Sequence, residues 1–393
     1  MEPNKRPYRV LPTIIFSLFA GGSLWFACNA VLDDLKPLYG YTDAALGYVT
    51  SSVQLGFIVG TLLFAVLTVS DRFSPRIVFL VCSLLGALFN IGMLQSSDLS
   101  TLILLRFMTG FFLAGIYPVG MKIAASWYQK DLGRALGYLV GALVLGTAFP
   151  HLLKTMGHTF SWKDLIPWTS IVACTGGLLL FLLVPDGPYL AKESEFNPRV
   201  INTIFKSADF RSSALGYFGH MWELYTLWAF MPVFLSMYAT HHAVEMDISF
   251  WSFCIIASGT VGCILGGHIS VRTGSGPVAW IQLLISGICC IFSPLVFFIP
   301  KAGFLFFLLI WGITVAGDSP QFSTLNAKTA PQDYVGSALT IVTSIGFFIT
   351  IISIQLESVL VRMLNPNFIF VMLVIGPVFG LRKLTRILHS RVK

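Results

Sequence analysis

The sequence contains few charged residues. Charged side chains make up 11% of its 393 residues, against about 25% in ordinary soluble domains. Hydrophobic residues make up 55%. This balance excludes a water-soluble protein of this length and predicts a membrane protein.

The sequence also lacks the short motifs of several enzyme classes. It contains no GxSxG turn, no HExxH pattern and no phosphate-binding nucleotide loop, which argues against a hydrolase and against an ATP-driven pump. All seven cysteines lie within apolar runs and none has metal-ligand spacing, so we interpret them as packing residues. We expect no enzyme activity, no cofactor and no metal; an intramembrane enzyme or sensor is the remote alternative.

Long apolar runs take up most of the chain. A run of about 18 or more apolar residues can cross a bilayer as a helix. Eleven runs meet this length, and the start of a shorter twelfth is obscured by the polar residues at 365–367. We predict an all-α protein of twelve membrane helices. The expected spans are Leu11–Val31, Ala44–Val69, Ile77–Leu94, Leu102–Trp127, Leu132–Leu153, Leu165–Val184, Ser212–Tyr238, Ser249–Ile269, Pro277–Ile299, Phe304–Leu325, Val335–Leu356 and Phe368–Leu381.

Basic residues are unevenly divided between the two sides of the membrane. Twelve spans place both termini on one side, and most Lys and Arg residues lie there. The loops of the opposite side hold only Lys36, Lys154, Lys163, Lys301 and Arg362. The positive-inside rule therefore predicts an inner (plasma) membrane protein with both termini in the cytoplasm. We attribute the net charge of +7 to this orientation and to anionic lipid of the bilayer, not to nucleic acid.

The longest polar interval divides the spans into two sets of six. We predict an N-terminal bundle over residues 1–184, a cytoplasmic linker over 185–211 and a C-terminal bundle over 212–393. The loops after the second and eighth spans are imperfect copies of each other, with Arg72 and Arg272 at equivalent places. Such a repeat is typical of carriers in which two similar bundles face each other across a site at the membrane midplane.

Short motifs occur in a defined order along these spans. The residues that carry them are Asp71, Arg72 and Arg76 after the second span, Arg106 and Gly110 in the fourth, Gly141 and Gly146 in the fifth, and Gly267, Arg272 and Gly274 after the eighth. Over essentially its full length the chain resembles the major facilitator superfamily, whose loop between spans two and three usually reads Gly-x-x-x-Asp-Arg-x-Gly-Arg-Lys/Arg. The resemblance implies a transporter of two six-helix bundles.

Two features depart from the patterns of that superfamily. Val271 stands where the second loop copy should have its acid, and the proline of the fifth-span antiporter motif comes late, at Pro150. The second departure argues against an exporter. The resemblance implies that Asp71, Arg72, Arg76 and Arg272 form a latch that joins the two bundles in the outward-open state; the alternative is that the arginines only anchor the protein at the membrane surface.

Three ionisable residues of the second half are candidates for proton coupling. Glu223 lies about 18 Å along a helix from Arg211 at 1.5 Å per residue, near the centre of a hydrocarbon core about 30 Å thick. An ionisable group at that depth is a functional hypothesis by default. His220 shares its helix face and could share its proton, whereas these two ligands are too few for a metal. Asp318 precedes Pro320, where we expect a break in the tenth span. A structural hydrogen bond for Glu223 and a helix cap for Asp318 remain the alternatives.

Aromatic and amide side chains are candidates for substrate binding. Tyr225 and Trp228 of the seventh span could stack on an organic substrate, with Trp25, Asn29 and Gln54 of the first two spans opposite them; packing is the alternative. Arg106 could bind a substrate carboxylate, assist proton release or pair with a backbone carbonyl.

These observations together predict a secondary active transporter that works by alternating access. We expect proton-coupled uptake of a small organic anion or zwitterionic metabolite by a monomer. The alternative is proton-driven export of an amphipathic compound such as a drug or siderophore. The identity of the substrate does not follow from the sequence.

Overall fold

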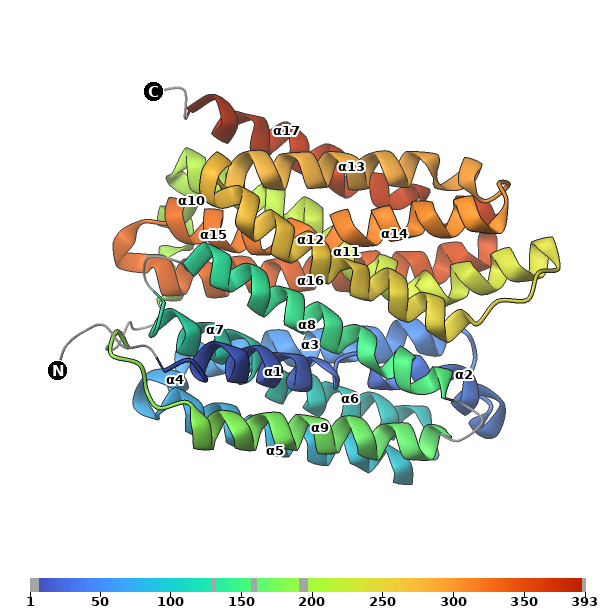
Figure 1. Ribbon diagram of the computed structural model, residues 1–393, viewed down its shortest axis with the longest axis horizontal. Coiled ribbons are helices and arrows are strands. Elements are labelled where there is room, and N and C mark those ends of the chain that lie inside the picture. The colour runs from blue at the N-terminus through green and yellow to red at the C-terminus, as the bar shows by residue number, and fades with distance from the viewer. Residues whose placement is uncertain (1–6, 129–131, 157–160, 191–196, 391–393) are drawn as a thin grey trace.

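The computed structural model describes residues 7–128, 132–156, 161–190 and 197–390. These residues form helices joined by short turns, and no strand occurs among them. Figure 1 shows the long helices running side by side in two groups, one from each half of the chain. The predicted all-α architecture of two bundles is confirmed.

The first bundle contains α1 to α9. Their bounds are α1 (Val10–Gly22), α2 (Ala27–Tyr39), α3 (Ala44–Val66), α4 (Val69–Arg72), α5 (Pro75–Gly92), α6 (Leu99–Leu113), α7 (Tyr117–Ala125), α8 (Leu132–Thr155) and α9 (Trp162–Leu183). The second group is α10 (Ile201–Lys206), α11 (Ala208–His242), α12 (Ile248–Thr273), α13 (Ser275–Val296), α14 (Lys301–Gly317), α15 (Ser319–Thr329), α16 (Val335–Met363) and α17 (Ile375–Ser390). The beginning of α1 and the end of α17 lie on the same side of the molecule (Figure 1), which we call the terminus side.

Eleven helical segments of the described chain are long and apolar enough to cross a membrane. The remaining predicted span lies in α11, which has 35 residues and is therefore about 52 Å long at 1.5 Å per residue. It is not among the eleven because its composition is more polar. It begins at Ala208, inside the predicted linker. The twelfth predicted span starts with short 3₁₀ turns before α17 and runs over Pro366–Leu388.

The first, fourth and tenth predicted spans are interrupted well inside their ends. The fourth breaks between α6 and α7, just before Pro118, and the tenth breaks between α14 and α15, just before Pro320. Proline has no amide hydrogen and clashes with the preceding turn, so it kinks or interrupts a helix. The first span breaks over residues 23–26, which contain no proline, and this break is not evident from the sequence. Interrupted membrane helices expose backbone groups that other residues must satisfy.

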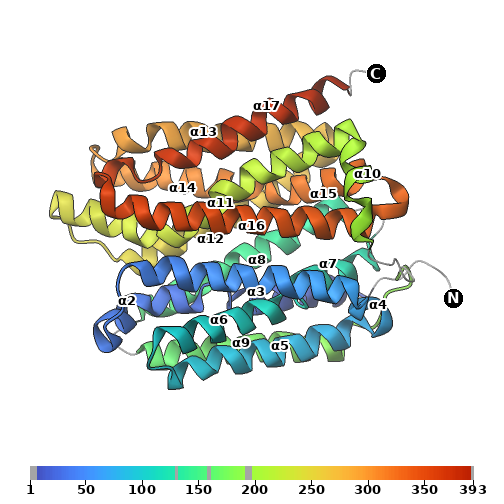
Figure 2. The same cartoon turned by 180° about the vertical axis from the view of Figure 1, so that it is seen from behind.

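The bundles meet along two pairs of helices. Figure 1 shows α8 beside α12, and Figure 2 shows α3 beside α16. Glycines allow the first pair to approach closely: a Cβ atom at Gly137 would lie 2.8 Å from the carbonyl oxygen of Cys263 and 3.2 Å from the Cα of Gly267. Small residues commonly permit such backbone contact between membrane helices.

Candidate functional site

Glu223 is buried in the interior of the second bundle. Its side chain on α11 is 1% exposed. One carboxyl oxygen accepts hydrogen bonds from Trp311 Nε1 at 2.7 Å, from the Ser286 hydroxyl and from Cys290 Sγ at 3.4 Å. These donors belong to α13 and α14, so the carboxyl group joins three helices. It is a polar group of the kind that marks ion pathways when it lies inside a membrane.

His220 pairs with Asp318 rather than with Glu223. Its Nδ1 lies 2.8 Å from Asp318 Oδ1, and its Nε2 lies 2.7 Å from the hydroxyl of Ser319. Both side chains of the pair are 1% exposed. Asp318 occupies the position before α15 but makes no capping hydrogen bond with its side chain, so the helix-cap interpretation is wrong. The three residues predicted for proton coupling therefore lie in one bundle, in two separate sets of contacts.

Arg106 binds the broken first span. It is fully buried on α6, and one guanidinium nitrogen donates to the carbonyl oxygens of Leu24 and Trp25, at 2.8 and 2.6 Å. The other terminal nitrogen donates to Asn90 Oδ1 at 3.0 Å. Leu24 and Trp25 lie between α1 and α2, where the helix leaves its carbonyl groups without helical partners. This geometry favours the backbone-pairing interpretation, and binding of a substrate by Arg106 stays a prediction.

We expect Arg106→Lys to destabilise the protein by about 2 kcal/mol. Lysine keeps the positive charge, but it lacks the planar fork that reaches several acceptors at once, and a hydrogen bond to a charged group contributes about 1.5–3 kcal/mol. Unfolding of the purified protein in detergent measures the effect. Arg382→Lys, at an exposed position of α17, is the matched control. Equal stability of Arg106→Lys and wild type would contradict this role.

An aromatic cluster joins the two bundles. Trp25 stacks on Tyr225 with ring centroids 5.6 Å apart, and Phe57 lies 4.4 Å from Phe347. Tyr225 also contacts Trp228 edge-on at 5.4 Å. Trp25 and Phe57 belong to the first bundle and the other three rings to the second. The structure therefore brings together the three aromatic residues predicted for substrate binding, Trp25, Tyr225 and Trp228, and adds Phe57 and Phe347, which were not predicted.

Hydrogen-bonding groups without partners accompany this cluster. Gln54 is fully buried on α3, one turn before Phe57, and neither its oxygen nor its nitrogen has a hydrogen-bond partner among the described residues. Asn29 donates to Thr50 at 2.7 Å, while its oxygen has no partner in the same part of the chain. The indole nitrogens of Trp25 and Trp228 are likewise without one among the described side chains and backbone. Buried polar groups normally have partners, so these groups are available to a polar ligand.

Two residues of the predicted latch, Arg72 and Arg76, contact residues of the first half of the chain. Arg76 Nε lies 3.7 Å from Asp186, which follows α9. Arg72 Nε donates to the hydroxyl of Thr68, one turn earlier. The side chain of Asp71 lies outside the described residues. A latch between the bundles in another conformation stays a prediction.

Glu357 is a buried acid that was not predicted from the sequence. The predicted eleventh span ends at Leu356, whereas α16 continues to Met363. Glu357 is fully buried, and neither carboxyl oxygen has a hydrogen-bond partner among the described residues. The apolar residues that follow it in the sequence were the available signal. Its neighbour Gln355 donates to Ser51 of α3 at 2.8 Å, so Glu357 lies close to a contact between the bundles.

Glu357→Met should stabilise the protein by about 1–3 kcal/mol. A polar group buried without a partner costs about that much in mutational data, and methionine fills a similar volume without needing a hydrogen bond. The midpoint of thermal unfolding in detergent tests this. Leu356→Met, at the exposed neighbouring position, should change little. A lower midpoint for Glu357→Met than for wild type would show that the carboxyl group is stabilised in the folded protein.

Comparisons with known proteins agree with this architecture. The family model of the Major Facilitator Superfamily matches residues 13–354. The arabinose-proton symporter of Bacillus subtilis (strain 168) is 28% identical over 220 residues, which are 50% of this chain and 46% of that protein. The chain thus matches about half the length of this relative.

Two solved structures share the fold. The human organic anion transporter MFSD10 superposes with a TM-score of 0.75 at 14% identity, over 96% of this chain and 100% of that one. The proton:xylose symporter XylE superposes with a TM-score of 0.76 at 13% identity, over 96% of each chain. At this level of identity the likeness concerns the fold alone.

Proposed function

The chain belongs to the Major Facilitator Superfamily and is a membrane transporter, and from this premise we propose that it takes up a small organic anion or zwitterionic metabolite together with protons. The transporter acts as a monomer in the inner membrane, with its terminus side in the cytoplasm. The uneven distribution of Lys and Arg supports this orientation.

The observation that carries the proposal is the separation of two kinds of polar group. The unpartnered amide and indole groups lie with aromatic rings where the two bundles meet, as in the pair Trp25 and Tyr225. Glu223 and the His220–Asp318 pair lie inside the second bundle. A solute held between the bundles is exposed to one side of the membrane and then to the other as the bundles rock. A proton can meanwhile bind to and leave a buried carboxyl group at a different place in the protein.

Protonation would couple to movement through the helices that Glu223 joins. Its carboxyl group contacts Trp311 on α14, and Asp318 lies where α14 gives way to α15. Gain or loss of a proton at either acid changes the hydrogen bonding across this break. The cost of an uncompensated charge inside the membrane favours rearrangement of the break when the proton leaves.

A neutral polyhydroxylated solute such as a sugar is a second candidate. Arg106, for which binding of a substrate carboxylate was one of three interpretations, donates to backbone carbonyls and to Asn90. Uncharged donors and acceptors beside aromatic rings also suit hydroxyl groups, and the similar Bacillus subtilis protein is named as an arabinose-proton symporter. No observation in the structure favours export of an amphipathic compound.

A ligand screen followed by flux measurements tests the proposal. Carboxylates, amino acids and sugars are first compared for their effect on thermal unfolding, and a stabilising compound is then offered to liposomes containing the protein. We expect uptake to rise with an inward proton gradient and to stop with a protonophore. An uptake rate that does not change with the proton gradient would refute proton coupling. Absence of flux for every stabilising compound would refute uptake itself.

A further inference from the structure

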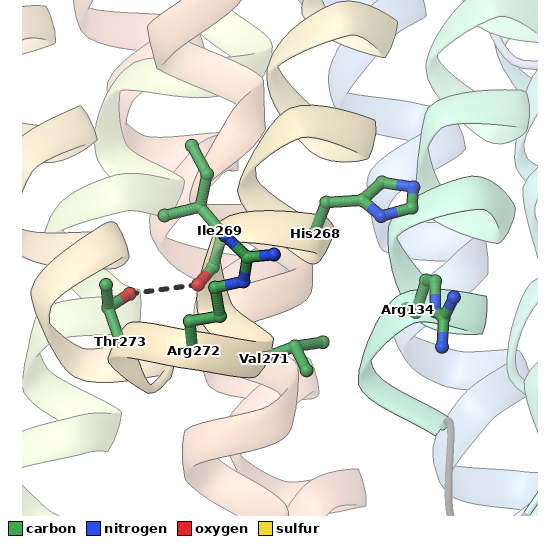
Figure 3. Close-up of a pocket in the computed structure, with 6 residues that line it drawn as sticks. All are labelled: Arg134, His268, Ile269, Val271, Arg272 and Thr273. Atoms are coloured by element: carbon green, nitrogen blue, oxygen red, sulfur yellow. Dashed lines mark hydrogen bonds between the residues drawn. The ribbon is translucent and has the colours of Figure 1, made fainter.

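A hollow lies between the bundles on the terminus side, away from the groups described above. Its volume is about 560 Å³, and it opens between the first turn of α8 and the last turns of α12. Figure 3 shows Arg134 on α8 at one side of the hollow and Arg272 on α12 across from it, with Val271 between them. The residues that line it are Arg134, His268, Ile269, Val271, Arg272 and Thr273. None of these described lining residues is acidic.

Apolar side chains form the membrane-facing part of this hollow. Ile269 and Val271 are 51% and 65% exposed, and Leu265, one turn earlier on the same helix, is 53% exposed. In a membrane helix, exposed aliphatic side chains contact lipid chains. In Figure 3 the side chain of Arg272 lies beside Ile269, and Arg134 lies on the other side of Val271. Positive charge beside an apolar surface matches a molecule with an anionic head and hydrocarbon tails.

We propose that this hollow binds the phosphate-bearing headgroup of an anionic membrane phospholipid. Its phosphate lies between Arg134 and Arg272, and its acyl chains follow Ile269 and Leu265 along α12. A free phosphate ion suits the site less well, because Ile269 and Val271 make part of the lining apolar and a free ion would leave that part without a partner. Arginine is well suited to phosphate because its planar fork can donate two hydrogen bonds.

The place of the hollow gives the bound lipid a specific consequence. Arg134 belongs to the first bundle and Arg272 to the second. Arg134 lies three residues before Gly137, and Arg272 lies five residues after Gly267, the two glycines at which the bundles make close contact. His268 and Tyr138 link the same two helices at 3.0 Å. A headgroup held by both arginines therefore favours the arrangement in which the ends of α8 and α12 are close. A ligand shifts a conformational equilibrium to the extent that its affinities for the two states differ.

Native mass spectrometry of the full chain in detergent, titrated with phosphatidylglycerol, tests the proposal. We compare wild type, Arg134→Gln, Arg272→Gln and the double variant, with zwitterionic phosphatidylcholine as the reference lipid. A basic residue near the membrane surface contributes to binding of anionic lipid by an amount equivalent to about a fivefold change in affinity. We expect about fivefold weaker binding of phosphatidylglycerol for each single variant, a larger loss for the double variant, and no change for phosphatidylcholine.

Arg382→Gln is the matched control, because this arginine is exposed on α17, whose end lies on the terminus side (Figure 1), and is not among the residues that line the hollow. It should bind phosphatidylglycerol as wild type does. The proposal fails if the control loses as much affinity as the two variants, or if the double variant keeps wild-type affinity. It also fails if inorganic phosphate displaces the lipid at equal concentration, since the site would then recognise a soluble anion. None of these outcomes depends on solute transport or proton coupling.

Discussion

Glu223→Gln should abolish accumulation of the solute against its gradient while solute exchange continues. Glutamine has nearly the same shape and can still accept a hydrogen bond from Trp311, but it cannot bind and release a proton. Each elementary charge that crosses 100 mV supplies about 2.3 kcal/mol, equivalent to about 50-fold accumulation. In liposomes with a proton-motive force of about 100 mV, replacing Glu223 should therefore reduce accumulation of the solute by about 50-fold.

Exchange of labelled for unlabelled solute should survive, because the groups available to the solute lie between the bundles and not around Glu223. Glu245→Gln provides the matched control: Glu245 is exposed in the turn after α11, and its replacement should leave both activities intact. Wild-type accumulation by Glu223→Gln would remove Glu223 from the coupling pathway. Loss of exchange as well would assign Glu223 a structural role instead.

Asp318→Ala should destabilise the protein by about 3–5 kcal/mol. Removing one member of a buried pair leaves the other without its partner in a place that water does not reach. His220 would lose the carboxyl oxygen that lies 2.8 Å from its Nδ1 and would keep its contact with the hydroxyl of Ser319. Chemical unfolding in detergent gives the free-energy difference from wild type.

A double-mutant cycle measures the interaction energy between His220 and Asp318 separately from their contacts with other residues. His220→Phe combined with Asp318→Leu replaces both polar side chains and should cost less than the sum of the two single changes, because neither variant side chain needs a partner. Ser319→Ala is the control, and loss of one neutral hydrogen bond should cost only about 1 kcal/mol. Additive effects of His220→Phe and Asp318→Leu would show that the two residues do not stabilise each other.

The candidate site shows where local sequence patterns stop being informative. Helical spacing correctly places His220 and Glu223 one turn apart in α11 and would allow them to share a proton, whereas the structure gives each its own partners. The partners come from α13, α14 and the α14–α15 break, which are far away in the sequence. Glu357 was missed for a related reason: a charged residue looks like the end of a span until packing shows that it is buried.

The sequence by itself determined the class of protein, its helical architecture and its division into two bundles, because the length of apolar runs, the positions of proline and the placement of basic residues act locally or on the whole membrane. Only the tertiary structure decided that Arg106 binds the break in the first span, that Trp25 meets Tyr225, and that two arginines from different bundles face one hollow. Such partners are chosen by the packing of helices that lie far apart in the chain, and no local pattern of hydrophobicity records which faces will meet.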